Sequence, residues 1–182
     1  MDLVKPEAKF EMTQMRENNQ EKELQTYKTH LLCDENGKYP ADLDDWEMAV
    51  VETESKRKGF SFWYRNPSQP GQSSLGVAYL DGDEYKIVRP DFIFFTTLDD
   101  GKVVADIVDP HGHYLADALP KLQGLALYAE AHSTAYRRIE SVAGVKGKLR
   151  VLDLTREDMR KAIAGAKDAA GLFVSHLAND YE

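Results

Sequence analysis

The spacing of apolar positions along the chain changes at Gly59. Upstream of it, Trp46 and Val50 lie on one side of a predicted helix that begins at Asp42 or Asp44 and ends in a basic run before the glycine. Downstream of it, short stretches rich in aromatic and β-branched residues alternate with Gly, Pro and Asp, which is typical of strands joined by turns. We expect four such strands, at residues 60–64, 74–80, 84–97 (broken by a proline) and 102–109.

Two helices and two further strands are expected in the second half of the chain. Leucine and alanine recur at helical spacing over residues 115–132. A start that resembles a capping box at residues 155–158 opens a long final helix that reaches about Leu177. The segments 135–142 and 148–154 are predicted strands. This order of elements predicts an α/β fold with a mixed sheet.

The N-terminal third differs from the rest in periodicity and in charge. Residues 6–29 are polar and carry only a weak apolar stripe, so we expect a helical extension or linker over residues 1–29 and the folded domain over residues 30–182. Residues 1–55 hold 6 basic and 14 acidic residues, whereas residues 56–182 hold 17 of each, so the net charge of -8 arises upstream. This distribution argues against a generic polybasic nucleic-acid binder but leaves room for a local basic face.

Composition narrows the class of protein further. With 182 residues, 42% of them apolar and 30% charged, the chain is long enough to form one domain with a hydrophobic core. No stretch approaches the roughly 18 to 20 apolar residues of a membrane helix, and no signal peptide opens the chain, so we expect a cytoplasmic protein without membrane contact. The single cysteine, Cys33, excludes an internal disulfide and a cysteine-ligated zinc module.

Acidic residues at the ends of predicted strands carry the candidate chemistry. Asp91 follows Pro90 inside an apolar run, where a buried carboxylate is costly unless it is paired, although an aspartate that caps a turn would also explain it. Asp109 and His111 are two residues apart and point the same way in an extended chain, although a plain Asp-Pro-His-Gly turn accounts for them equally well.

The predicted first helix supplies two more acids. Glu47 and Glu54 are seven residues apart and share one helix face, for which a solvated surface is the default interpretation. Oxygen ligands from a helix and two adjacent strands are nevertheless what a Mg²⁺ site needs, and such an ion can activate water beside a phosphodiester.

These segments, taken together, resemble a known nuclease family. The pair Pro90-Asp91, followed eighteen residues later by Asp109-Pro-His111, is similar to the PD-(D/E)XK nuclease signature, with His111 where the family usually has lysine. The wider context, over about residues 27–154, resembles the C-terminal nuclease domain of type III restriction enzymes and related restriction-type helicases. The segments that carry this wider resemblance are Trp46-Glu47, Glu54, Phe62-Trp-Tyr-Arg-Asn-Pro67, Pro90-Asp-Phe-Ile and Val108-Asp-Pro-His-Gly112.

The resemblance implies a restriction-endonuclease-like fold, in which helices flank a mixed central sheet, and Mg²⁺-dependent cleavage of DNA, with Mn²⁺ as a possible substitute. Asp91 and Asp109 would be metal ligands, and Glu54 would be the third, with Glu47 as its alternate. The family also implies a helicase or translocase partner.

The missing lysine of the motif has several possible replacements. His111 stands at the lysine position, and Lys121 or Gln123, at the start of the next helix, would substitute for it. Arg65 and Asn66 would lie near the scissile phosphate or brace the site, and Lys121 would also contact DNA.

Several alternatives remain open at this point. An earlier register would put Asp106 in place of Asp109, but its third position is then the apolar Val108. His113 forms a His-Gly-His sequence with His111, which a turn explains more simply than a metal ligand does. The chain has no Gly-x-x-x-x-Gly-Lys-Ser/Thr loop, so a motor would be a separate domain or subunit.

The sequence leaves the oligomeric state and the recognised DNA open. The principal alternative function is a catalytically degenerate domain of the same fold that binds DNA or braces a helicase partner. An unrelated α/β enzyme acting on a small molecule is a further alternative.

Overall fold

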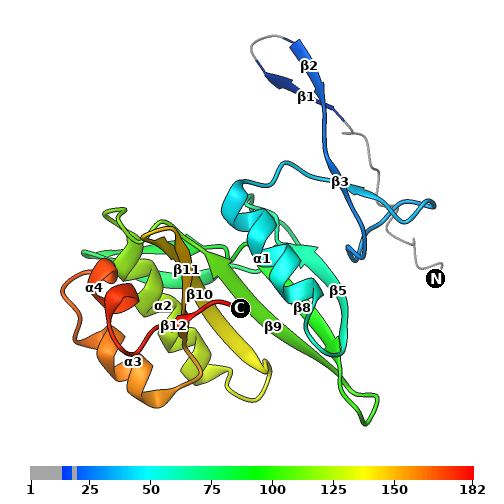
Figure 1. The fold of residues 1–182 in the computed structure, drawn as a ribbon. Helices are drawn as coiled ribbons and strands as arrows, with labels where there is room; N and C mark the ends of the chain where they lie inside the picture. Colours follow the sequence, from blue (N-terminus) through cyan, green and yellow to red (C-terminus); the bar gives the residue numbers. More distant parts are fainter. Residues whose placement is uncertain (1–13, 18–19) are drawn as a thin grey trace, which may run out of the picture.

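The computed structural model describes residues 14–17 and 20–182, and a six-stranded mixed sheet forms its centre (Figure 1). The strands lie in the order β12-β11-β10-β9-β8-β5. Their bounds are Phe60–Arg65 for β5, Phe92–Thr97 for β8, Val103–Pro110 for β9, Arg138–Val145 for β10, Lys148–Asp153 for β11 and Asn179–Asp180 for β12.

The sheet is mixed because a helix separates its two antiparallel parts. β5, β8 and β9 form an antiparallel run, and α2 (Ala118–Ala131) then carries the chain across so that β10 lies parallel to β9. β10 turns back into β11 through Lys146 and Gly147, which both have positive φ, the conformation that a two-residue hairpin turn requires. The expected α/β class with a mixed sheet is therefore confirmed.

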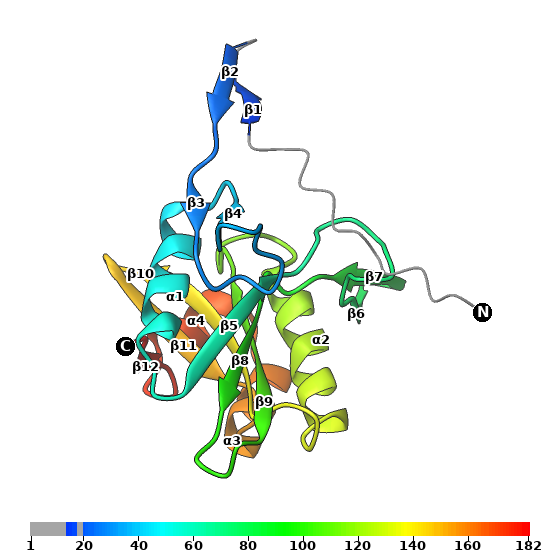
Figure 2. The same cartoon turned by 90° about the vertical axis from the view of Figure 1, so that its right-hand side faces the viewer.

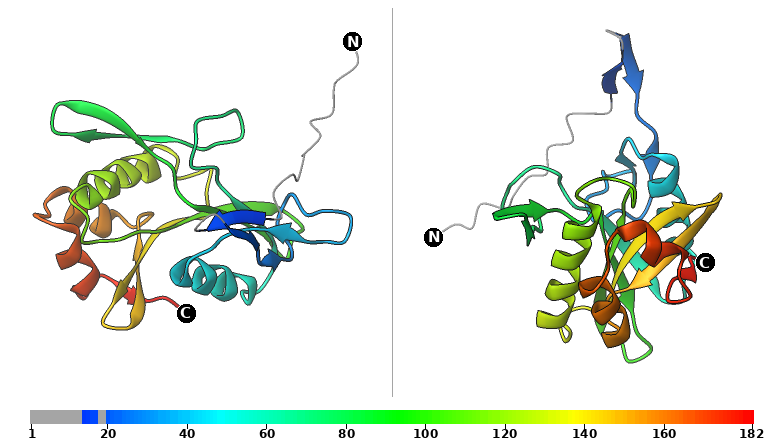
Figure 3. Two further views of the ribbon diagram at one scale, coloured as in Figure 1. Left: turned by 90° about the horizontal axis from the view of Figure 1, so that it is seen from above. Right: turned by 90° about the vertical axis from the view of Figure 1, so that its left-hand side faces the viewer.

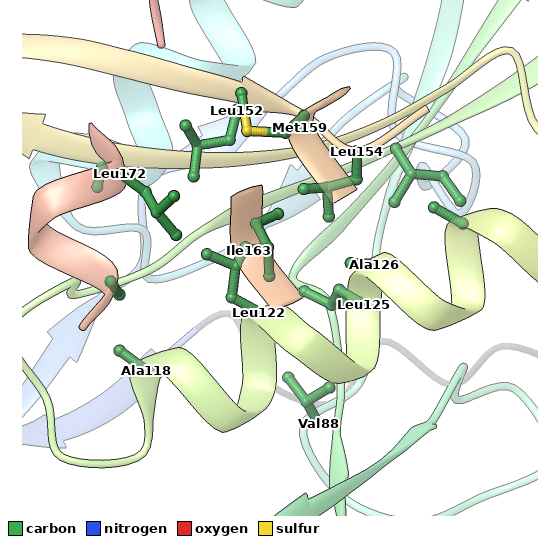
Figure 4. Packing of buried hydrophobic residues seen from close by; sticks show 14 of the residues in the cluster. Val88, Ala118, Leu122, Leu125, Ala126, Leu152, Leu154, Met159, Ile163 and Leu172 are labelled. Carbon is green, nitrogen blue, oxygen red and sulfur yellow. The ribbon is translucent and has the colours of Figure 1, made fainter. Parts of the chain in front are cut away.

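Helices cover both faces of the sheet (Figure 2). α1 (Asp45–Ser55) packs on one face, and α2, α3 (Glu157–Ala164) and α4 (Ala169–Val174) pack on the other. β9 serves both cores, because Val108 points to the α1 side and Ile107 to the α2 side. Figure 4 shows Leu122 of α2 gathered with Ile163 of α3 in the larger core.

The start of α1 is as the sequence predicts. Asp44 accepts hydrogen bonds from the backbone N–H groups of Trp46 and Glu47, and the Glu47 carboxylate accepts one from the N–H of Asp44 in return. This reciprocal capping box satisfies N–H groups that the helix itself leaves unpaired.

The long final helix is a wrong prediction. The segment forms two short helices, because α3 ends at Gly165 and a new cap starts at Asp168, whose side chain accepts from the N–H of Gly171. The capping box at residues 155–158 is also absent, since the Thr155 hydroxyl donates to Asp153.

The helical N-terminal extension is wrong for the residues that the structure describes there. β1 (Gln14–Glu17) pairs with β2 (Gln20–Glu23), and β3 (Thr26–Tyr27) pairs with β4 (Tyr39–Pro40). A weak apolar stripe gives a helix nothing to bury, so local pairing prevails. Residues 1–13 and 18–19 lie outside the described residues.

The predicted break at Pro90 separates two sheets. Upstream of it, β6 (Val77–Asp81) and β7 (Glu84–Val88) form a hairpin that is not part of the central sheet and lies along α2 (Figure 3). Downstream of it, the chain enters β8. None of the helices in the described part of the chain is long and apolar enough to cross a membrane.

Candidate functional site

Two aspartates lie side by side where β8 begins and β9 ends. Phe92 is paired with Val108 across these antiparallel strands, so Asp91 stands opposite Asp109. The backbone N–H of Asp91 donates to Oδ1 of Asp109 at 3.1 Å. Asp109 is buried and Asp91 is half-buried.

Burial raises the pKa of both carboxyl groups above the usual aspartate value. For Asp91, desolvation is the largest cause, followed by the negative charges of Asp109 and Glu47. For Asp109, desolvation again dominates, and the hydrogen bond from Asp91 and the charge of Lys121 act against it. The pair is therefore short of positive charge, which a cation would supply.

Lys121 of the neighbouring helix α2 lies near Asp109 and His111. Its charge lowers the pKa of both Asp109 and His111, which places the ammonium group near both. Its Nζ also lies 2.7 Å from Oδ2 of Asp117, one helical turn earlier. Lys121 thus lowers the pKa of Asp109, whereas the cation that lowers the pKa of Asp91 is Arg65.

His111 follows Asp109 as the sequence predicts. Its backbone N–H donates to the carbonyl of Val142 at 2.8 Å, which extends the parallel pairing of β9 with β10. Burial is the main cause that lowers the pKa of its imidazole, so the ring is neutral near pH 7. Its Nε2 is buried and has no hydrogen-bond partner among the described residues.

A small cavity of about 10 Å³ adjoins His111, at the lower limit of the space that one water molecule needs. Asp109, His111 and Lys121 contribute polar groups to its wall, together with His113 and Ser141. Ser141 is paired in register with Asp109, and nothing in its own sequence signals this position. His113 lies in a turn, as the simpler interpretation of the His-Gly-His sequence expects, and its buried Nδ1 also lacks a partner in the described part of the chain.

Glu47, the alternate third acid, has a stronger electrostatic effect on Asp91 than Glu54 has. Its charge contributes to the raised pKa of Asp91. Its carboxylate is already engaged, because Oε1 lies 2.7 Å from Nη2 of Arg65 and Oε2 accepts the N–H of Asp44. Glu47 would have to exchange Arg65 for a metal ion to become a ligand.

The structure does not bring Glu54 to Asp91 and Asp109. Two helical turns beyond Glu47, its buried carboxylate accepts hydrogen bonds from Arg57, from Arg138 at 2.5 Å and from the hydroxyl of Tyr181 at 2.7 Å. These partners account for its burial, so the expected role as third metal ligand is corrected to that of an ion-pair partner between α1 and the sheet.

Asp106 belongs to this same ion-pair network. It is fully buried, faces the α1 side of β9 and binds Arg137 and Arg138. Because successive residues of a strand face opposite sides, Asp106 and Asp109 lie on different faces of the sheet. The earlier register of the motif is therefore not the one that forms the carboxylate pair.

Three other predicted site residues are held by neighbouring parts of the protein. Gln123 donates to the carbonyl of Ile163 at 3.4 Å and lines a separate cavity of about 690 Å³ between α2 and α3, so it does not replace the missing lysine. Arg65 binds Glu47 and the carbonyl of Asp42. Its guanidinium therefore holds α1 on β5 and is not free for DNA.

Asn66 braces the site and does not face DNA. Its side chain is buried and donates to the carbonyls of Leu75 and Pro90, both at 2.8 Å. Its backbone N–H donates to the carbonyl of Asp91 at 2.8 Å. Asn66 thus fixes the peptide that carries Asp91.

The site can offer a divalent ion no more than a few protein ligands. Within the described residues, no three His, Cys, Asp or Glu side chains stand together in a geometry that holds a metal. Mg²⁺ often binds proteins through one or two carboxylates and keeps several waters or substrate phosphates. Asp91 and Asp109 match that mode, and Glu54 and Gln123 take no part in it.

The fold and this site define a mixed α/β protein with a carboxylate pair at the ends of adjacent strands and a lysine on the following helix. The chain belongs to the YagJ family, whose family model matches residues 28–182. It is 64% identical over 182 residues to Protein YagJ of Escherichia coli (strain K12), and the match covers 100% of this chain and 74% of that protein. No solved structure matches the chain.

Proposed function

We propose that this chain is a divalent-metal-dependent DNA endonuclease domain with a restriction-endonuclease-like fold. The observation that carries the proposal is the pairing of Asp91 with Asp109 at the ends of β8 and β9. Two desolvated carboxylates with raised pKa values are unfavourable unless a cation joins them, and such perturbed pairs are concentrated at functional sites.

The order of elements supports the finer fold assignment. The chain contains, in order, helix α1, the antiparallel strands β5, β8 and β9 with the β6–β7 hairpin inserted between β5 and β8, the crossover helix α2, and strand β10 parallel to β9. This arrangement suits a mixed central sheet flanked by helices, which the resemblance implies. It places Asp91 and Asp109 next to each other, where β8 begins and β9 ends.

The residues have separate roles in the proposed hydrolysis. Asp91 and Asp109 would hold Mg²⁺ or Mn²⁺, which when bound would polarise the phosphodiester and the attacking water. Lys121 stabilises negative charge from the α2 side, in place of the lysine that the motif lacks. His111 is neutral and accepts a proton at an imidazole nitrogen.

Plasmid cleavage with Mg²⁺ or Mn²⁺ tests the proposal. Wild type is expected to cut, and Asp109→Asn is expected to lose about 100-fold in rate, because it removes one of two ligand charges. The matched control is Asp99→Asn, at an exposed carboxylate that pairs with Lys58. Absence of cleavage by wild type with either ion, or equal cleavage by Asp109→Asn, would count against it.

A second candidate is a domain of the same fold that binds DNA or braces a helicase partner without cutting. The engagement of Glu47 by Arg65 favours it, because that ion pair leaves the aspartates without a third acid. In this case wild type retards DNA in a gel-shift assay but leaves plasmid intact, and Asp109→Asn binds DNA as wild type does.

A further inference from the structure

β7 is the outer strand of a two-stranded sheet. β6 lies against α2 and buries Val77 and Tyr79, whereas residues 84–87 of β7 are exposed. In the part of the chain that the structure describes, β7 pairs with β6 alone. Its other edge presents backbone N–H and C=O groups that a further strand can bind.

The hairpin turn determines which backbone groups point outward. Gly82 and Asp83 form the turn, and Asp81 is paired with Glu84 at its base. In a two-residue hairpin this base pair exchanges hydrogen bonds, and the ladder alternates from there. Glu84 and Lys86 therefore direct their backbone groups to β6, and Tyr85 directs its own outward.

One face of this hairpin is apolar and uncovered. Tyr85 is 81% exposed, and Leu80, its partner in register on β6, is 52% exposed. Ile87, two residues along the same face, is 48% exposed. Exposed apolar side chains beside an open strand edge are typical of a surface that another protein covers.

We propose that β7 pairs antiparallel with β7 of a second copy of this chain, across a two-fold axis at Tyr85. In that register Glu84 stands opposite Lys86 of the second copy, and Lys86 stands opposite its Glu84. The sequence Glu-Tyr-Lys is thus complementary to itself in charge, and Lys86, whose Nζ lies 2.6 Å from Oδ2 of Asp81 in its own chain, would be shared between that carboxylate and Glu84 of the second copy. The two Tyr85 rings form an aromatic pair.

The backbone geometry agrees with this register. The outward N–H and C=O of Tyr85 meet those of its copy, so the central pair exchanges two hydrogen bonds. The result is a four-stranded sheet in the order β6-β7-β7-β6, whose apolar faces are continuous. A two-fold interface of this kind is closed and needs no third copy.

Sedimentation equilibrium of the full chain measures the assembly at concentrations of about 1 to 100 µM. Wild type is expected to form a dimer over this range. Glu84→Lys replaces two attractive pairs by two repulsive ones and is expected to weaken the dimer about tenfold or more. The double variant with Glu84→Lys and Lys86→Glu reverses both charges between the copies and is expected to restore it, because the pair with Asp81 that Lys86→Glu removes lies within one chain and is lost equally from monomer and dimer.

Two further variants separate this edge from other surfaces. Tyr85→Pro removes the outward N–H, which an edge strand tolerates in the monomer but which the paired sheet needs, so the dimer is expected to be lost. Val174→Glu, at a 60% exposed position of α4, should leave the dimer unchanged. Circular dichroism confirms that each variant is folded.

A monomeric wild type at the highest concentration overturns the proposal. So does a dimer that persists in both Glu84→Lys and Tyr85→Pro, because another surface then forms it. Failure of the double charge reversal to restore the dimer, with both chains folded, overturns the register at Tyr85.

Discussion

At the scale of single residues, the buried carboxylates of Asp91 and Asp109 lower the stability of the metal-free protein when they are ionised. Their raised pKa values mean that the folded protein holds more protons than the unfolded chain between the ordinary aspartate pKa and the raised one. Stability therefore falls as pH rises through that window. A cation bound by both carboxylates would remove this loss.

Asp109→Asn is therefore expected to stabilise the metal-free protein by about 1 to 2 kcal/mol at pH 8 and by much less at pH 4. Asparagine keeps the oxygen that accepts the N–H of Asp91 but carries no charge. Urea unfolding in the presence of a chelator at the two pH values measures the difference, and Asp99→Asn serves as the exposed control. A variant less stable than wild type at pH 8 contradicts the cause given for the pKa shifts.

His111 determines how the site performs without the motif lysine. A neutral imidazole accepts a proton but supplies no fixed positive charge, so we expect weak cleavage, faster with Mn²⁺ than with Mg²⁺ and rising as pH climbs through neutrality. His111→Lys is expected to raise the Mg²⁺-dependent rate by about tenfold or more.

Initial rates of plasmid cleavage across pH test this expectation. His132→Lys, at the exposed end of α2, is the matched control and should change nothing. If neither wild type nor His111→Lys cuts DNA while both bind it, the non-cleaving candidate is favoured.

At the scale of elements, helix α2 contacts the central sheet, the candidate site and the β6–β7 hairpin. It carries the chain from β9 to β10, places Lys121 near Asp109 and supports the β6–β7 hairpin. The hairpin lies so close that a Cβ at Gly124 would overlap the Cβ of Tyr79 and meet the carbonyl of Ala78 at 3.1 Å. A glycine costs about 1 kcal/mol inside a helix, and this close approach explains its presence.

Gly124→Ala is expected to destabilise the protein by about 1 to 2 kcal/mol, because the clash outweighs the better helix propensity of alanine. Hydrogen exchange should be faster in residues 77–88 as the hairpin moves off α2. Gly165→Ala is the control, since a Cβ there meets its nearest atom at 3.7 Å. Unchanged exchange in the hairpin would contradict the proposed clash.

At the scale of the whole molecule, one half-buried cation joins segments that are distant in sequence. Arg138 of β10 binds Glu54 of α1, Asp106 of β9 and Glu140, which lies beside it on β10. Tyr181, near the C-terminus, donates to the same Glu54. Burial raises the pKa of Glu140 to about 7, although Arg138 lowers it, so desolvation outweighs the ion pair at this carboxyl group.

Arg138→Met is expected to destabilise the fold by about 3 to 5 kcal/mol, because it leaves three buried carboxylates without their shared partner. The loss should be larger at pH 8 than at pH 5, where these acids can protonate. Urea unfolding at both pH values is the measurement. Arg156→Met, which removes an exposed pair with Asp158, should leave the free energy of unfolding almost unchanged.

The elements that could be predicted from the amino-acid sequence are those that begin or end at residues acting on neighbouring backbone. The cap at Asp44, the break at Pro90 and the change of period at Gly59 act through neighbouring backbone atoms, so they can be read without the fold. The spacing of Asp109 and His111 on an extended strand is local in the same sense. The error in the final helix arose because Gly165 and Asp168 stop it, although the apolar residues on both sides continue the pattern.

Which acidic side chains lie next to one another depends on the packing of distant segments and cannot be read from the chain alone. Glu47 and Glu54 are both glutamates, and their spacing in the sequence puts them on one face of one helix. Asp106 and Asp109 likewise lie on the same strand. The register of β8 with β9 and the position of α1 on the sheet place Asp109 beside Asp91 and leave Glu54 with Arg138. Such pairings depend on packing between segments far apart in the chain, and the local period of a sequence carries no information about them.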